Sequence, residues 1–247
     1  MKVVVSSDWH PDHVSHGVSR FAEVADAAHI TVDRAIAEGA RLYVFAGDLC
    51  NPDRGSSTFR CVELALDIAQ RLSKADIPSV WVAGNHDVIE DGSGDTALSP
   101  LRALARYTAE DAGGVHVFER PGVYAHPSGN GPAVIALPFT ASSHGYDVEA
   151  TLHDLASKLH PNLRDKALTV AHLNIAGVVP GEETTEMARG REVWLPVAAA
   201  RKATRFVVNG HYHRKQRTKD GVWIPGSLAR FTFGEEGNQP SFLMLEV

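Results

Sequence analysis

Five short apolar runs in this chain are each followed directly by a motif rich in histidine, aspartate or asparagine. The runs are KVVVSS, RLYVFA, SVWVA, ALTVA and RFVVN, and their length and β-branched content are typical of buried strands. The motifs are Asp8-Trp9-His10, Gly47-Asp48, Gly84-Asn85-His86-Asp87, His172 and Gly210-His211-Tyr212-His213. In open α/β sheets, sites form at the carboxyl ends of the strands. Residues far apart in the sequence are therefore expected to meet at one edge of the fold.

Strand-like and helix-like segments alternate in the first half of the chain. The sequence predicts strands at Val3–Ser7, Leu42–Ala46 and Ser79–Ala83, with helices at Val18–Glu38 and Thr58–Ser73 between them. Such alternation is typical of a parallel sheet covered by helices.

The second half is less regular, and no repeat, low-complexity segment or linker interrupts it. We expect one α/β domain over residues 1–247, because this length suits a single domain of the larger α/β kind. The remaining predicted elements are helices at Ser99–Asp111 and Tyr146–Leu159, strands at Val115–Phe118, Gly122–Ala125, Ala133–Leu137, Lys166–Ala171 and Phe242–Glu246, and a hairpin that joins Lys215–Thr218 to Val222–Ile224.

The residue types in the motifs indicate metal chemistry. Carboxylates and imidazoles suit divalent Mn, Fe or Zn, whereas a thiolate-rich set would favour structural zinc. Asp48 is the candidate bridge, because a carboxylate can donate to two cations at once. Two metals about 3.5–4 Å apart can clamp a phosphoryl group and lower the pKa of a bound water. His86 could then protonate a leaving alkoxide, and Asp87 could orient the His86 ring.

Each motif has a simpler explanation when it is taken alone. Gly-Asp after a strand is commonly a turn, and Gly-Asn tolerates positive φ. All five motifs nevertheless occur after strand-like runs, and together they supply seven protein ligands, too many for one tetrahedral ion. We therefore expect two divalent metal ions. We expect Mn²⁺, with Fe, Zn and Mg as alternatives.

The motifs, in the order D-x-H, GD, GNH[DE], H and GH-x-H, resemble those of the calcineurin-like metallophosphoesterases, and the match runs from Asp8 to His213. The resemblance implies an α/β sandwich of two central mixed β-sheets flanked by helices. It implies that His86 contacts the scissile phosphate. The metal ligands that it implies are Asp8, His10, Asp48 and His213 for one ion, and Asp48, Asn85, His172 and His211 for the other.

A narrower resemblance is to the SbcD-like nuclease subunits of bacterial DNA repair complexes. It rests on SSDWH, AGDLCNP, IPSVWVAGNHD, VAHLNIAG and the tail IPGSLARFTFGEEGNQPSFLMLEV, which contains Gly226-Ser227 and Phe233–Glu236. It implies metal-dependent cleavage of DNA phosphodiester bonds. It also implies an SbcC-like ATPase as a candidate partner.

Two departures from the SbcD-like pattern limit this reading. Many nuclease relatives carry a histidine three residues after the GD aspartate, tied to exonuclease action, where this chain has Asn51. They also continue into a DNA-capping domain and an ATPase-binding segment, for which the 34 residues after His213 leave no room. We expect the catalytic core alone.

Composition bears on the substrate and on the cellular compartment. The net charge of −6 weighs against broad sequence-independent DNA binding, which depends on surplus Lys and Arg. Two cysteines give no disulfide framework and suit a reducing compartment. No signal peptide and no apolar run long enough to span a membrane is present, so we expect a cytoplasmic protein without a membrane partner.

DNA is the favoured substrate, and the alternatives are a small-molecule or cyclic-nucleotide phosphodiesterase and a non-catalytic binding scaffold. Asn51 and the acidic net charge favour the small-molecule alternative, whereas the SbcD-like tail favours DNA. The complete ligand set argues against a scaffold. The candidate substrate-binding residues are Asn51, His13, Arg214 and Lys215.

Overall fold

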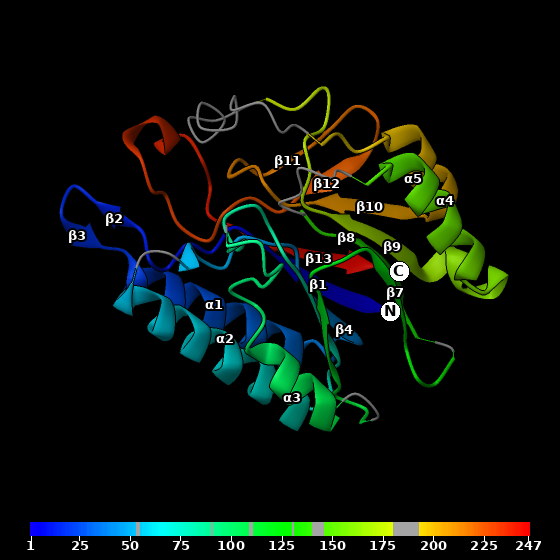
Figure 1. Cartoon of the computed structure of the whole chain (residues 1–247), viewed down its shortest axis with the longest axis horizontal. Helices are drawn as coiled ribbons and strands as arrows, with labels where there is room; N and C mark the ends of the chain where they lie inside the picture. Colours follow the sequence, from blue (N-terminus) through cyan, green and yellow to red (C-terminus); the bar gives the residue numbers. More distant parts are fainter. Residues whose placement is uncertain (53–54, 90, 109–110, 130, 140–145, 180–192) are drawn as a thin grey trace.

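Two β-sheets lie face to face, and each is covered by helices on its outer side, which gives four layers in the order α/β/β/α (Figure 1). The computed structural model describes residues 1–52, 55–89, 91–108, 111–129, 131–139, 146–179 and 193–247. The predicted α/β sandwich with two central mixed sheets is confirmed.

The first sheet has five strands in the spatial order β13-β1-β4-β5-β6. All neighbours are parallel except β13, which pairs antiparallel with β1 and brings the two chain ends together at one edge (Figure 1). The strands are β1 (Lys2–Ser6), β4 (Leu42–Phe45), β5 (Ser79–Val82), β6 (Val115–Phe118) and β13 (Leu243–Glu246).

The second sheet has six strands in the spatial order β11-β12-β10-β9-β8-β7. Its four central strands are parallel, and the two edge strands are antiparallel to their neighbours. The strands are β7 (Gly122–Ala125), β8 (Ala133–Leu137), β9 (Ala167–Ala171), β10 (Phe206–Asn209), β11 (Gln216–Arg217) and β12 (Val222–Ile224).

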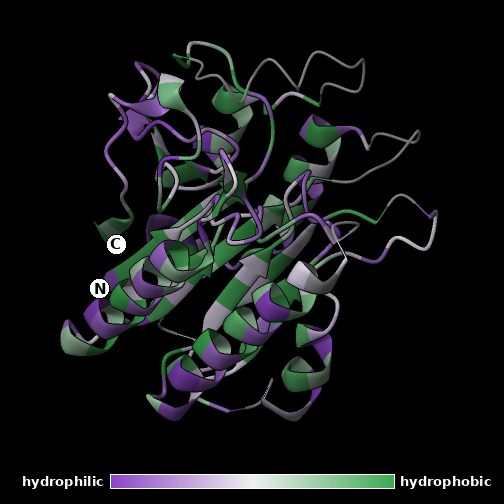
Figure 2. Cartoon of the chain, turned by 90° about the vertical axis from the view of Figure 1, so that its left-hand side faces the viewer, coloured by the Kyte–Doolittle hydropathy of each residue, from purple (hydrophilic) through white to green (hydrophobic). Residues whose placement is uncertain are grey.

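Side chains that alternate along the strands build three stacked apolar layers. Val3 and Val5 of β1 point into the layer between the two sheets, whereas Val4 packs under the helices on the other face. In β8, Ile135 and Leu137 point away from the first sheet toward the helices that cover the second. Figure 2 shows the hydrophobic strands enclosed between helices whose outward faces are hydrophilic. Burial on both faces explains why the strands read as unbroken apolar runs.

The helices divide between the two outer layers. Helices α1, α2 and α3 cover the first sheet, and α4 and α5 cover the second (Figure 1). Their bounds, with those of two 3₁₀ helices, are α1 (Phe21–Ala37), α2 (Ser56–Lys74), α3 (Leu101–Thr108), α4 (Val148–Lys158), α5 (Val197–Ala203), η2 (Pro161–Lys166) and η4 (Phe233–Glu235).

The first helix begins later than predicted. Val18–Ser19 is not helical but forms β3, which pairs antiparallel with β2 (Val14–Ser15). His16 and Gly17 connect the two strands with φ of 49° and 82°. Positive φ at both central residues is what a two-residue hairpin turn of type I′ requires, and it ends any helical path through this segment. The predicted strand at Lys215–Thr218 is likewise shorter, because only Gln216–Arg217 pairs with β12.

Within the part of the chain that the structure describes, no helix is long and apolar enough to cross a membrane. Cys50 and Cys61 are both buried and free.

Candidate active site

The predicted ligands follow the carboxyl ends of parallel strands in both sheets. Asp8, Asp48 and Asn85 follow β1, β4 and β5 of the first sheet. His172 and His211 follow β9 and β10 of the second. The site therefore lies where the carboxyl edges of the two sheets meet, as the strand pattern predicts.

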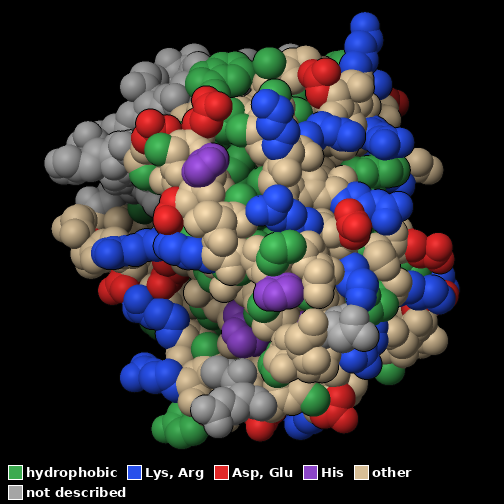
Figure 3. Space-filling model, turned by 90° about the vertical axis from the view of Figure 1, so that its right-hand side faces the viewer, with side chains coloured by type: hydrophobic (Ala, Val, Ile, Leu, Met, Phe, Trp, Pro, Cys, Tyr) green, Lys and Arg blue, Asp and Glu red, His purple; other side chains and the backbone are tan. Residues whose placement is uncertain are grey.

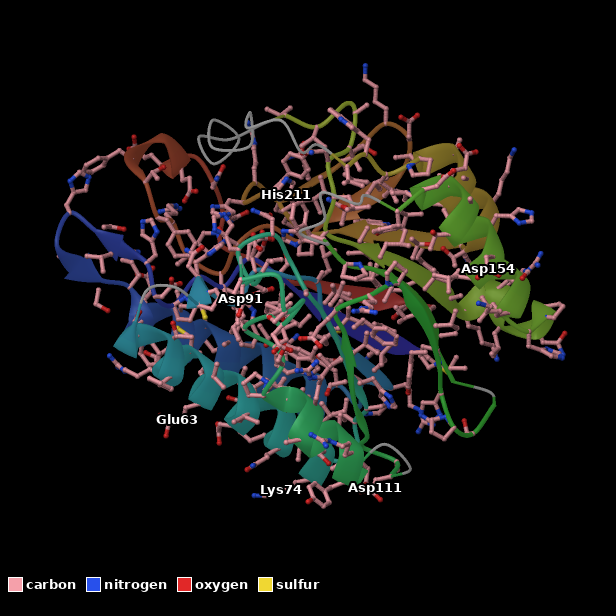
Figure 4. The ribbon with its side chains drawn as sticks, in the orientation of Figure 1. Glu63, Lys74, Asp91, Asp111, Asp154 and His211 are labelled. Carbon is pink, nitrogen blue, oxygen red and sulfur yellow. The ribbon has the colours of Figure 1, made fainter. Side chains whose placement is uncertain are left out.

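Hydrogen bonds join the two sheet edges at this point. The backbone N–H of His211 donates to Asp8 Oδ1 at 3.0 Å, and His172 Nδ1 donates to the Ala46 carbonyl at 2.7 Å. Each bond links a residue of the second sheet to one of the first. Figure 4 shows His211 inside the molecule, whereas Glu63 points outward from the helical layer.

The predicted ligands gather in two clusters of three. The donor atoms within each cluster all lie within 4.8 Å of one another, and all six residues are buried. The clusters are Asp8, His10 and His213, and Asp48, His172 and His211. Which residues bind metal stays a prediction; the two clusters contain six of the seven predicted ligands, grouped as the family resemblance implies, and Asn85 is in neither.

Unusual backbone geometry aims several of these side chains. Asp8, His10, Asp48 and His211 have φ of 53°, 44°, 64° and 76°, in the left-handed region that side chains other than glycine seldom adopt. Each such residue costs about 1–3 kcal/mol, and such strain concentrates at functional sites. The described chain has six such residues, and four of them are predicted ligands.

The motif glycines leave room for the ligands beside them. A Cβ at Gly84 would lie 2.1 Å from Asp48 Oδ1, and a Cβ at Gly47 would lie 2.1 Å from His172 Nδ1. Any side chain at either position would therefore displace a predicted ligand. The glycines of the GD and GNHD motifs are explained by this close packing.

Asp48 has the geometry of a bridging ligand. Its Oδ2 lies 3.1 Å from His172 Nε2 and 3.6 Å from His10 Nε2, so one oxygen faces a histidine of each cluster. Two donors bound about 2.1 Å from one ion at right angles lie roughly 3 Å apart. The His172 Nε2 to Asn85 Oδ1 distance of 3.1 Å fits the same geometry.

Two of the histidine nitrogens lie where a cation would be stabilised. His10 Nε2 is buried and has no hydrogen-bond partner within the described part of the chain. Burial alone would lower the pKa of His172, yet the Asp48 carboxylate raises it to about 9. A positive charge is thus favoured at His172 Nε2, where it faces two oxygens, and a divalent cation would supply it.

The protonation states of the other donors suit metal binding. Burial holds the pKa of His10 well below its usual value and lowers the pKa of His211 to about 3, so both rings keep a free lone pair at neutral pH. Burial opposes ionisation of Asp48, but His172 and His86 outweigh it and hold the pKa of this carboxyl well below its usual range. Burial raises the pKa of Asp8 to about 6, a cost that a bound cation would relieve.

His86 stands beside the clusters and is only half-buried. The centroid of its ring lies 4.9 Å from that of the His10 ring, and the two rings are packed edge to face. Its backbone N–H donates to Asp48 Oδ1 at 2.9 Å, and its Nδ1 lies 2.8 Å from Asn51 Oδ1. With Nδ1–H donated to this amide oxygen, Nε2 is left for a substrate.

The structure corrects the role expected for Asp87. Its carboxylate does not orient the His86 ring but accepts hydrogen bonds from the backbone N–H groups of Asp48, Leu49 and Gly84, at 2.7–3.0 Å, and from Cys50 at 3.2 Å. It therefore ties the GD loop to the GNHD loop. Adjacent residues on a tight turn point in different directions, and for this reason the ring partner is Asn51 instead.

Two other contacts of the histidines were not foreseen. His211 Nε2 lies 3.2 Å from Asn174 Oδ1, and His213 Nδ1 lies 2.6 Å from Glu235 Oε1. In the sequence, Glu235 is distinguished only as part of the tail that resembles the SbcD-like nucleases. Nothing in its composition distinguishes the buried Glu235 from the exposed Glu236 beside it.

The predicted substrate-binding residues lie around this centre at different depths. The His13 ring packs on Phe231 at 5.0 Å, and Phe231 in turn contacts the His10 ring at 5.6 Å. Arg214 and Lys215 follow His213 and are exposed. Figure 3 views the molecule from the right-hand side of Figure 1, and on that face, which does not display the predicted ligands, Lys and Arg side chains are interspersed with Asp and Glu.

The family model described as calcineurin-like phosphoesterase matches residues 1–215, and the chain belongs to this family. Among solved structures, it is similar to the protein TT1561 of Thermus thermophilus, with 16% identity, a TM-score of 0.53, and coverage of 92% of this chain and 89% of that one. It is also similar to a dimetal phosphatase from Danio rerio, with 12% identity, a TM-score of 0.55, and coverage of 99% and 91%. At these identities the likeness shows the fold.

Family and geometry together define the class of protein. The chain is a metal-dependent phosphoester hydrolase whose site is a dinuclear divalent metal centre between two β-sheets.

Proposed function

We propose that this protein hydrolyses phosphodiester bonds and that its substrate is DNA, as in the SbcD-like nucleases it resembles. The observation that carries the proposal is the position of the SbcD-like tail. Phe231 packs on His10 and His213 at 5.6 and 5.4 Å, and Glu235 contacts His213 at 2.6 Å. The residues that carry the narrower resemblance are therefore built into the metal centre.

The chain's own residues supply the acid catalysis. When bound, two divalent cations stabilise developing negative charge and activate water. His86 is half-buried and packs on the ring of His10, and it donates a proton from Nε2 to the leaving oxygen. Asn51 fixes the ring through Nδ1, and the Asp12 carboxylate accepts from the Asn51 backbone N–H at 3.2 Å. This chain of contacts holds the acid in one orientation.

An aromatic and basic rim supports a nucleic-acid substrate. The Phe233 ring is 80% exposed and lies 4.7 Å from the exposed His16 ring on the β2–β3 hairpin. Exposed aromatic rings can stack on unpaired bases, and Arg214 and Lys215 can attract phosphates.

A small-molecule phosphodiesterase is the second candidate. Asn51 at the position of the nuclease histidine and the net charge of −6 favour it. A neutral amide holds a phosphate less strongly than an imidazolium does.

A substrate panel tests the proposal. The purified protein is incubated with Mn²⁺ and a single-stranded circle, a blunt duplex, a hairpin, a chromogenic phosphodiester and a chromogenic phosphomonoester. His86→Ala, purified in parallel, is the control for contaminating nucleases. We expect DNA cleavage at a higher kcat/KM than that for the chromogenic diester. Hydrolysis of small diesters without DNA cleavage would favour the second candidate, and turnover of the monoester alone would contradict both.

A further inference from the structure

Glu235 is a buried carboxylate in an exposed turn. It ends η4, and its residue is 1% exposed, whereas Phe233, Gly234 and Glu236 are exposed. Its Oε1 accepts from His213 Nδ1 at 2.6 Å, and its Oε2 accepts from the Phe231 backbone N–H. Both oxygens therefore have donors, and one donor is the ring of a predicted ligand.

This contact determines which nitrogen of His213 can bind a metal. A carboxylate that accepts from Nδ1–H fixes the tautomer, orients the ring and makes the other nitrogen a stronger donor. Nε2 is then the nitrogen of His213 with a free lone pair for the cluster that it forms with Asp8 and His10.

Among the contacts that the structure describes, none of the three other predicted histidine ligands has a carboxylate partner outside the two clusters. His172 Nδ1 donates to the Ala46 carbonyl while its Nε2 lies 3.1 Å from Asp48, and His211 Nε2 donates to the Asn174 amide oxygen. His10 Nε2 lies 3.6 Å from Asp48, which both clusters share. The cluster of Asp8, His10 and His213 therefore has two carboxylates of its own, while the other has only the shared one.

We propose that Glu235 is a positioning residue that makes the Asp8–His10–His213 cluster the tighter of the two metal sites, so that this site fills first. The inference goes beyond the proposed function and does not depend on it, because it concerns metal affinity and not the substrate. A protein that cleaves no DNA would still show it.

The test is a titration of metal-free protein with Mn²⁺, in which free Mn²⁺ is followed by electron paramagnetic resonance. We expect two binding steps in the wild type. Glu235→Gln should weaken the tighter step by about 10- to 100-fold, the usual effect of losing such a partner, and leave the weaker step unchanged. Glu236→Gln is the matched control, because it removes the same charge from the next residue, which is exposed. Equal effects of the two variants, or no effect of Glu235→Gln, would overturn the proposal.

Two measurements on the wild type stand even if Glu235→Gln does not fold. Crystals soaked with less than one equivalent of Mn²⁺ should show the anomalous peak at Asp8, His10 and His213, and a stronger peak at Asp48, His172 and His211 would overturn the proposed order. With ¹⁵N-labelled histidine and Zn²⁺, NMR should show His213 protonated at Nδ1, assigned by comparison with His213→Asn. A deprotonated Nδ1 would overturn the role of Glu235.

Discussion

Replacing Gly84 by alanine tests whether Asp48 must stay where the structure places it. The added Cβ would lie 2.1 Å from Asp48 Oδ1 and 2.5 Å from the Asp48 backbone nitrogen, whereas ordinary contacts begin at 3.4 Å. The distance between residue 84 and the Asp48 carboxylate must therefore increase by more than about 1 Å. Gly84 does not have positive φ, so alanine adds no backbone strain of its own.

Asp48 has little freedom to move away from such a side chain. Its backbone N–H donates to Asp87 Oδ2 at 3.0 Å, and its Oδ1 accepts from the His86 backbone N–H at 2.9 Å. A misplacement of about 1 Å can cost roughly 100-fold in rate, and we expect a loss of about that size in kcat/KM. Overpacking should cost about 1–3 kcal/mol of unfolding free energy, or a fall in Tm of about 2–12 °C for a chain of this size.

The assay combines kcat/KM, bound metal by atomic absorption and Tm by calorimetry. Gly237→Ala is the control, because a Cβ there meets nothing within 4 Å and the residue does not have positive φ. A Gly84→Ala enzyme that keeps two metals and loses less than about threefold in kcat/KM would refute the argument that Asp48 is a closely held bridge.

Three further predictions concern the acid, its partner and the metals. His86→Ala should lower kcat by about 10²–10⁴-fold and leave the metal content unchanged by atomic absorption; normal turnover, or loss of metal, would contradict its role. Asn51→Leu removes the 2.8 Å contact between Asn51 Oδ1 and His86 Nδ1 and should lower kcat by about 2- to 13-fold. Asn51→His should selectively increase digestion of a blunt duplex over that of a single-stranded circle. Duplex digestion that is robust in the wild type and unchanged in Asn51→His would contradict the role given to Asn51. Chelation should lower Tm in calorimetry, because ligand at 100 times its Kd stabilises the fold by about 2.7 kcal/mol, and an unchanged Tm would show that no metal was bound.

The convergence of the site could be predicted because it follows from strand direction. Asp8 and Asp48 follow buried runs of the first sheet and His172 follows one of the second, and within each sheet parallel strands bring their carboxyl ends to one edge whatever the connections between them. The apolar runs identify these strands because both faces of each sheet are covered. The approximate place of each ligand thus depends on local pattern alone.

The side-chain partners could not be predicted because they depend on tertiary contacts. His86 and Asp87 are adjacent in sequence, yet Asp87 binds the backbone of the GD loop while Asn51 binds the His86 ring. Glu235 comes 22 residues after His213, and only the folded tail shows that it is buried. The β2–β3 hairpin was missed for a related reason, since positive φ at His16 is not visible in the local pattern.

The contacts that hold the ligand loops belong to the protein and not to the metals. Asp87 links two of the loops through four backbone N–H groups, and the His211 N–H bond to Asp8 joins the two sheets. Structural zinc sites behave differently, because there the metal supplies the folding free energy itself. Here the folding free energy comes from the strands and helices whose side chains form the three apolar layers. Their packing also offsets the cost of the strained backbone at Asp8 and Asp48. The metal-free protein should therefore keep its native circular dichroism spectrum at 25 °C while its Tm falls, and complete unfolding on chelation would contradict this account.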